Sequence, residues 1–223
     1  MDVLFLDAPY RKEIKLNKQT LDYINKNNYR KLGIYASVQF CNNLNNVLVQ
    51  LKENNVKYFS SKPKRTDKEF QILGCDAFHD SLNLKEKIDA FLYIGDGRFH
   101  PLALILGQKD SKFEDFKEVL IYDPIGDKFE VLNYNEIKRI LKKYKGSLLK
   151  FLNSKNIGIL ITVKPGQQHF NPGLKLEEIY KDKKFYFFVD NDINFNSFEN
   201  FSFIEFCINT ACPRIGFDDA VNL

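Results

Sequence analysis

The sequence has no tryptophan, one methionine and only four cysteines among its 223 residues. No Cys-x-x-Cys pair occurs, and the three histidines lack the spacing of a zinc finger or ribbon, so a structural zinc site is disfavoured. No apolar run approaches the roughly 20 residues of a membrane span, and Val3–Leu6 is too short for the apolar part of a signal peptide. We therefore expect a cytoplasmic protein whose cysteines stay reduced, as core thiols or as ligands.

A strong charge of one sign is also missing. The 33 basic residues are nearly matched by 29 acidic ones, which leaves a formal net charge of +4. No basic stripe with interleaved aromatic residues occurs, so we expect no direct binding of nucleic acid. Neither a Walker A motif nor a Rossmann fingerprint is present, which disfavours the two commonest nucleotide-binding loops.

What the sequence does contain is an alternation of strand and helix patterns. Hydrophobic spacing predicts helices at 17–27, 42–51, 98–106, 135–152 and 174–180. Short apolar runs predict strands at 3–6, 31–38, 56–59, 89–94, 119–122, 157–163, 185–189 and 203–208. Such alternation predicts an α/β fold of two related βαβ-type domains with parallel sheets flanked by helices. We place the domains at 1–134 and 135–223.

The most unusual segment is Gly95-Asp96-Gly97-Arg98-Phe99-His100, which directly follows a predicted strand. Open parallel sheets bind ligands beyond the carboxyl ends of their strands. Here backbone amides could meet an anion, Arg98 could grip a carboxylate, and His100 could titrate or form a hydrogen bond. An exposed turn with an Asp–Arg pair is the plainer interpretation, but the density of charge favours a functional loop.

Three further motifs are weaker when taken singly. Taken alone, Gly74-Cys75 is better explained as a buried thiol than as a ligand loop, and Lys164-Pro165-Gly166-Gln167 could be a plain turn. Cys212, beside Arg214, is a reasonable thiolate site. A cysteine–histidine hydrolase that uses Cys75 or Cys212 with His100 is an alternative, although no feature ties these residues together. Of the remaining cysteines, Cys207 lies inside a predicted strand and Cys41 at the start of a predicted helix, so we expect core thiols.

Taken in order, these motifs resemble the diphthamide synthase family. Leu-Gly-Cys, Gly-Asp-Gly-Arg-Phe-His, Lys-Pro-Gly-Gln and Ala-Cys-Pro-Arg match the family's second and third domains, from about residue 3 to the C-terminus. The resemblance implies three related α/β domains that each give one cysteine to a 4Fe-4S cluster, whose unique iron meets S-adenosylmethionine. It also implies that a 3-amino-3-carboxypropyl radical is transferred to a histidine of elongation factor 2.

The resemblance also assigns residues. It implies that Cys75 and Cys212 are cluster ligands. It implies further that the S-adenosylmethionine pocket is lined by Asp96, Gly97, Arg98, His100, Lys164 and Gln167. Whether Arg98 or Lys164 contacts the carboxylate of S-adenosylmethionine is left open at this point.

The family's first domain, with its cysteine, has no counterpart in this sequence. Three thiolates hold such a cluster while leaving one iron open, and only two cysteines here match. We expect a split gene, in which a separate polypeptide carries the first domain and the third cysteine, and a dimer of such units. The alternative is a degenerate or non-catalytic subunit that binds a partner or a small anionic metabolite.

Overall fold

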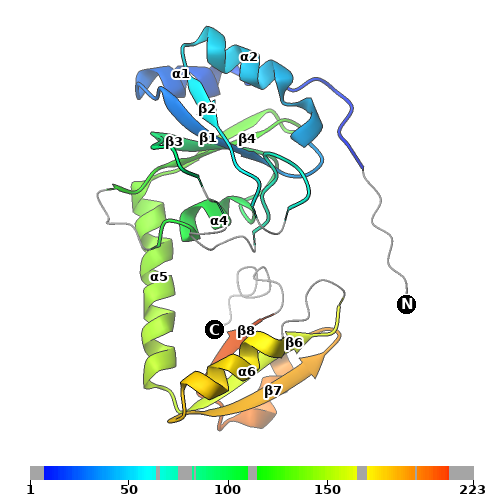
Figure 1. Ribbon diagram of the computed structural model, residues 1–223, viewed down its shortest axis with the longest axis vertical. Coiled ribbons are helices and arrows are strands. Elements are labelled where there is room, and N and C mark those ends of the chain that lie inside the picture. The colour runs from blue at the N-terminus through cyan, green and yellow to red at the C-terminus, as the bar shows by residue number, and fades with distance from the viewer. Residues whose placement is uncertain are drawn as a thin grey trace. The chain divides into compact units, whose positions relative to one another are not determined.

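The structure is a computed structural model that describes residues 8–63, 66–74, 82, 84–109, 115–164, 170–193 and 195–210 (Figure 1). The chain divides into two compact units, with the break between Leu141 and Lys142. This break falls inside the long helix α5 (Tyr134–Asn153), whose first residue lies beside the predicted boundary. The predicted strand at 3–6 lies outside the described residues.

The first unit is built on a five-stranded sheet with the order β2-β1-β3-β4-β5. Its strands are β1 (Lys31–Ala36), β2 (Lys57–Phe59), β3 (Ala90–Ile94), β4 (Val119–Asp123) and β5 (Lys128–Leu132). Neighbouring strands from β2 to β4 are parallel, whereas β5 runs antiparallel to β4. The sequence analysis missed β5, because this edge strand is half-buried and mixes charged with apolar residues.

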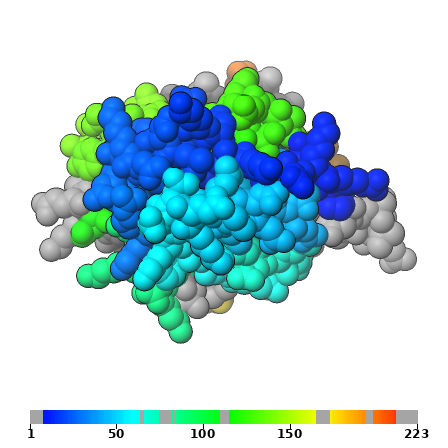
Figure 2. All heavy atoms as spheres, turned by 90° about the horizontal axis from the view of Figure 1, so that it is seen from above, coloured from blue at the N-terminus to red at the C-terminus, as the bar shows by residue number. Residues whose placement is uncertain are grey.

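Helices lie on both faces of this sheet. The described helical segments that precede α5 in the first unit include α1 (Lys18–Lys26), η1 (Cys41–Asn43), α2 (Asn45–Glu53) and α4 (Pro101–Leu106). The helices α1 and α2 cover one face, which Figure 2 shows in blue and cyan, and α4 packs on the other (Figures 1 and 2). As predicted, Asn17 caps α1: its Oδ1 accepts a hydrogen bond from the backbone N–H of Thr20 at 3.0 Å.

The two faces have separate hydrophobic cores, because neighbouring residues of a strand point to opposite sides. In β3, Leu92 and Ile94 pack toward α1 and α2, whereas Phe91 and Tyr93 pack toward α4. All four are at most 5% exposed. Strands buried on both faces are typical of parallel sheets covered by helices, which is why they have continuous apolar runs in the sequence.

The second unit is built on a three-stranded parallel sheet with the order β7-β6-β8. Its elements after α5 are β6 (Asn156–Thr162), α6 (Phe170–Ile179), β7 (Lys184–Asp190), η3 (Phe195–Phe201) and β8 (Phe206–Asn209). Helix α6 begins four residues before the predicted helix, and β8 begins three residues after the predicted strand. The α/β fold with parallel sheets flanked by helices is confirmed, and β5 is its antiparallel exception.

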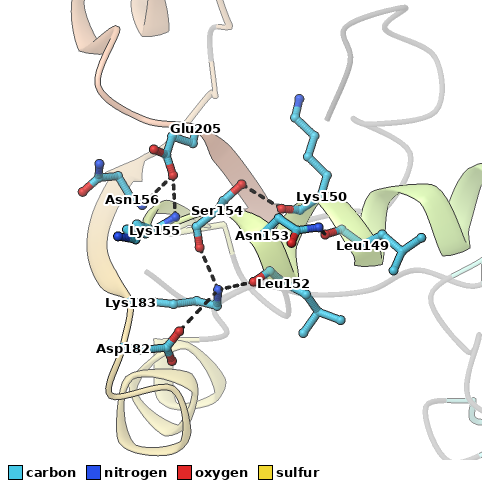
Figure 3. Close-up of polar contacts among 10 residues, drawn as sticks. All are labelled: Leu149, Lys150, Leu152, Asn153, Ser154, Lys155, Asn156, Asp182, Lys183 and Glu205. Atoms are coloured by element: carbon cyan, nitrogen blue, oxygen red, sulfur yellow. Dashed lines mark hydrogen bonds and ion pairs between the residues drawn. The ribbon is translucent and has the colours of Figure 1, made fainter.

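Lys183 fixes the junction between α5 and β6 (Figure 3). Its side chain is only 3% exposed, and Nζ donates to the carbonyl oxygens of Leu152 at 2.8 Å and Ser154 at 2.7 Å. The same ammonium lies 5.2 Å from the centre of the Phe151 ring. A cation at the carboxyl end of a helix satisfies carbonyl groups that have no partner within the helix. Lys183 therefore ends α5 and sets the start of the central strand.

Candidate functional site

The loop Gly95–His100 follows β3 at the carboxyl edge of the first sheet. Its two glycines are required for different reasons. A Cβ atom at position 95 would lie 2.4 Å from the Tyr93 hydroxyl oxygen, so only glycine leaves room there. Gly97 has a φ of +67°, which is unfavourable for residues with a side chain, although no described atom lies within 4 Å of the place a Cβ would take. Asp96, between them, is exposed.

Arg98 is bound within its own unit. Its guanidinium pairs with the carboxylate of Glu130 in β5 and lies 3.6 Å from a carboxylate oxygen of Glu136 in the first turn of α5. Glu136 also accepts a hydrogen bond from the Asn133 backbone N–H, and Asn133 Oδ1 accepts from the Glu136 N–H, which forms a capping box. Two carboxylates thus already balance the charge of Arg98, one of the two residues considered for contact with the substrate carboxylate.

His100 and Phe99 contact Gly74, the residue that precedes Cys75. The Gly74 backbone N–H donates to His100 Nδ1 at 3.0 Å. The ring of Phe99 lies so close that a Cβ atom at position 74 would be 2.5 Å from it. The structure therefore joins the Leu-Gly-Cys motif to the Gly-Asp-Gly-Arg-Phe-His motif, although 26 residues separate the hydrogen-bonded pair. Cys75 itself lies outside the described residues.

The sequence analysis overlooked two buried hydroxyl groups beneath this loop. Tyr93 is fully buried, Ser37 is 8% exposed, and a Cβ atom at position 95 would be 2.9 Å from Ser37 Oγ. Within the described part of the chain, neither hydroxyl makes a hydrogen bond of good geometry. Burial raises the pKa of Tyr93, and the neighbouring Ser37 hydroxyl opposes part of that effect. In the sequence, the only sign of a buried hydroxyl group here is that Tyr93 follows two apolar residues in a predicted strand.

Lys164 follows β6 in the second unit, as its motif predicts. Its Nζ pairs with the Asp192 carboxylate, and these side chains are 45% and 74% exposed. Thr162 fixes the backbone beneath, since its Oγ1 accepts from the Lys164 N–H at 3.3 Å and donates to the Asn191 carbonyl oxygen at 3.0 Å. Gln167 lies outside the described residues. Asp96, Gly97, Arg98 and His100 belong to the first unit.

The two described cysteines do not resemble thiolate ligands. Cys41 Sγ donates to the Ser37 carbonyl oxygen at 3.4 Å and packs against the core beneath α1 and α2. Cys207, in β8, faces Gly158 of β6, and burial raises the pKa of its thiol. A raised pKa disfavours the thiolate, which is the form that binds a metal. Cys212, like Cys75, lies outside the described residues.

Neither a metal-binding cluster nor a membrane-crossing helix occurs in the described ranges. There, no group of three or more His, Cys, Asp and Glu side chains could hold a metal ion. No described helix is both long and apolar enough to cross a membrane. A hollow of about 560 Å³ lies beside the edge strand β2, but none of those predicted site residues that the structure describes lines it.

Comparison with known proteins identifies the family. Residues 1–222 match the family model described as "Putative diphthamide synthesis protein". The chain belongs to this family. It is 33% identical over 158 residues to the 2-(3-amino-3-carboxypropyl)histidine synthase of Methanocaldococcus jannaschii, a match that covers 67% of the chain and 41% of that protein. The corresponding Pyrococcus horikoshii synthase is 28% identical over 151 residues, which cover 67% of the chain and 40% of that protein.

Solved structures show the same fold. The crystal structure of Dph2 from Pyrococcus horikoshii superposes with a TM-score of 0.71 at 24% identity and covers 93% of this chain and 58% of that one. A crystal structure of the same protein with a 4Fe-4S cluster gives a TM-score of 0.70 and covers 90% and 57%. The sequence matches to the two archaeal synthases cover 41% and 40% of those proteins, so the chain spans about two fifths of their length.

Proposed function

We propose that this chain is part of a 2-(3-amino-3-carboxypropyl)histidine synthase. The enzyme would transfer the 3-amino-3-carboxypropyl group of S-adenosylmethionine to a histidine of elongation factor 2. Membership of the diphthamide synthesis family and the names of the relatives support the reaction. The observation that carries it in this structure is the hydrogen bond from Gly74 to His100, because it joins two of the motifs at the carboxyl edge of one sheet.

A 4Fe-4S cluster is the cofactor that we propose, as in the solved relative. We assign Cys75 and Cys212 as ligands because their motifs match those of the family, whereas Cys41 donates to a carbonyl oxygen and Cys207 lies within strand β8. When bound, the cluster supplies the electron that cleaves S-adenosylmethionine. Since three thiolates leave one iron open for substrate, we propose that the third comes from outside these residues. A separate polypeptide that carries the family's first domain is the source we expect.

The residues of this chain would bind and orient S-adenosylmethionine. We propose that its pocket is lined by Asp96, Gly97, Arg98, His100, Lys164 and Gln167. The exposed carboxylate of Asp96 suits the positive sulfonium. We assign the substrate carboxylate to Lys164, because a single exposed acid, Asp192, competes for its charge. Arg98 is held by two acids, so its role in the pocket is to fix the loop.

The partners follow from the same proposal. Elongation factor 2 is the protein substrate, the unit that carries the first domain completes the cluster site, and two such units form a dimer. We place the reaction in the cytoplasm, where elongation factor 2 acts.

Anaerobic reconstitution tests the cofactor and its ligands. With the polypeptide that carries the first domain, the chain should take up iron and turn brown. Cys75→Ala and Cys212→Ala should abolish this absorbance, whereas Cys41→Ala and Cys207→Ala should retain it. Loss of colour in the second pair alone would show that the ligand assignment is wrong. A stable complex that binds no iron in any form would favour a non-catalytic subunit that holds a small anionic metabolite.

A further inference from the structure

We propose that His100 and Phe99 are positioning residues that hold the backbone of Gly74 and thereby fix where Cys75 begins. This inference rests on the proposed function, because the position of Cys75 matters most if its sulfur is a cluster ligand. This role is additional to the place of His100 in the proposed S-adenosylmethionine pocket, and it acts on the cluster through Gly74 alone. The two act on Gly74 in two ways, His100 through a hydrogen bond and Phe99 through ring packing.

The hydrogen bond defines the chemical state of His100. A backbone N–H can only donate, so His100 Nδ1, 3.0 Å from Gly74 N, must accept and carry no proton. The imidazole is therefore neutral, with its proton on Nε2. Its orientation is restrained by the chain that follows, because Pro101 begins α4 and five of the six residues of that helix are buried. The accepting atom, His100 Nδ1, therefore belongs to the residue that directly precedes the buried helix α4.

Phe99 explains why residue 74 is glycine. Gly74 is not among the residues with positive φ, so its backbone conformation does not require glycine. The requirement is space, since the nearest Phe99 ring atoms would lie 2.5 Å from an added Cβ. Real Cβ contacts are never that short, so any side chain at position 74 would push Phe99 away. Glycine allows the ring to lie directly against the backbone.

A second attachment holds the same segment a few residues earlier. The Ala36 N–H at the end of β1 donates to the Phe70 carbonyl oxygen at 2.7 Å, and the Ile72 N–H donates to the Ala36 carbonyl oxygen at 3.0 Å. The segment that leads to Cys75 is therefore tied to β1 at Phe70–Ile72 and to the loop after β3 at Gly74.

Pre-organisation of this kind is what groups behind a metal ligand supply. Residues that do not touch a metal but hold its ligands commonly change metal affinity by about 10- to 100-fold when they are mutated. Here the restraint acts on the backbone beside the ligand instead of on the ligand side chain. It should exist before any cluster is bound, so it can be measured in the metal-free chain.

The test compares three substitutions at position 100. His100→Asn places its Oδ1 where Nδ1 lies and keeps the acceptor, His100→Gln moves the amide farther from the backbone, and His100→Leu removes it. In the metal-free protein, hydrogen exchange at the Gly74 amide should accelerate roughly tenfold in the Leu and Gln variants and little in Asn. Alkylation of Cys75 should accelerate in the same variants, while that of Cys207 should not change.

Equal exchange rates at Gly74 in the wild type and all three variants would overturn the proposal. If His100→Leu does not fold, Gly74 exchange rates in His100→Asn and His100→Gln still decide the proposal, because only the Gln variant should exchange faster. Iron uptake separates this inference from the proposed function. Full iron uptake in a variant with an unprotected Gly74 amide would refute positioning but leave the function standing. A protected amide in a wild-type complex that binds no iron would support the restraint and refute the function.

Discussion

The Arg98 guanidinium lies 3.6 Å from the carboxylate of Glu136, which also closes the capping box of α5. We predict that Arg98→Ala mainly loosens the connection between loop and helix, with a loss of stability of about 0.2–1 kcal/mol because the pair is half-exposed. Binding of S-adenosylmethionine should weaken less than in Lys164→Ala. Urea denaturation and calorimetry measure the two effects, and Arg139→Ala, an exposed arginine on the same helix, is the control.

Lys164 is the residue at which we expect the larger change in affinity. Loss of a charge-assisted hydrogen bond to the substrate carboxylate should weaken binding of S-adenosylmethionine by about 1.5–3 kcal/mol in Lys164→Ala. Asp192→Asn should strengthen binding, because it releases Lys164 from its present partner. Calorimetry on the reconstituted complex measures both, and Lys175→Ala in α6 is the matched control. If Lys164→Ala binds S-adenosylmethionine with unchanged affinity, Arg98 and not Lys164 contacts the substrate carboxylate.

Lys183 should matter for the stability of the second unit. Lys183→Met keeps the buried stem but leaves the Leu152 and Ser154 carbonyl oxygens without this donor, which should cost about 1–3 kcal/mol. Lys184→Met changes the neighbouring exposed lysine and should cost little. Hydrogen exchange of the β6 amides in increasing urea reports on this unit separately. Equal effects of the two substitutions would mean that the cap does not stabilise α5.

Glu118 makes the first unit sensitive to alkali. Its carboxylate accepts hydrogen bonds from the hydroxyls of Tyr23 at 2.9 Å and Tyr29 at 2.8 Å. Burial and then Glu118 raise the pKa of Tyr23 to about 12 and also raise that of Tyr29. A raised folded pKa means that stability is fully present below the unfolded value of about 10 and is lost as the pH rises toward 12.

The substitution Glu118→Gln keeps an acceptor but removes the negative charge. The pKa of both tyrosines should fall, and less stability should then be lost between about pH 10 and 12. Urea denaturation at several pH values, with tyrosinate absorbance followed in parallel, measures the two quantities. If the Glu118→Gln variant loses stability between about pH 10 and 12 as steeply as the wild type, burial alone raises the pKa values of the two tyrosines.

The sequence predicted the parts of the fold that depend on local pattern. Buried strands such as β3 and the Asn17 cap follow from hydrophobic runs and from side-chain capping. The edge strand β5 could not be predicted from a hydrophobic run, because its polar residues form a strand only by pairing with β4. The partners of Arg98 were therefore unpredictable: Glu130 is close only because β5 forms. The bond between Gly74 and His100 likewise depends on tertiary packing across 26 residues.

Cleavage of S-adenosylmethionine under reducing, anaerobic conditions tests the central claim most directly. With the polypeptide that carries the first domain, the chain should form methylthioadenosine, and Cys75→Ala or Cys212→Ala should prevent it. The chain alone should form none. Full activity of the chain alone would contradict the requirement for an outside thiolate, and a stable complex that contains neither cluster nor product would contradict the proposed function itself.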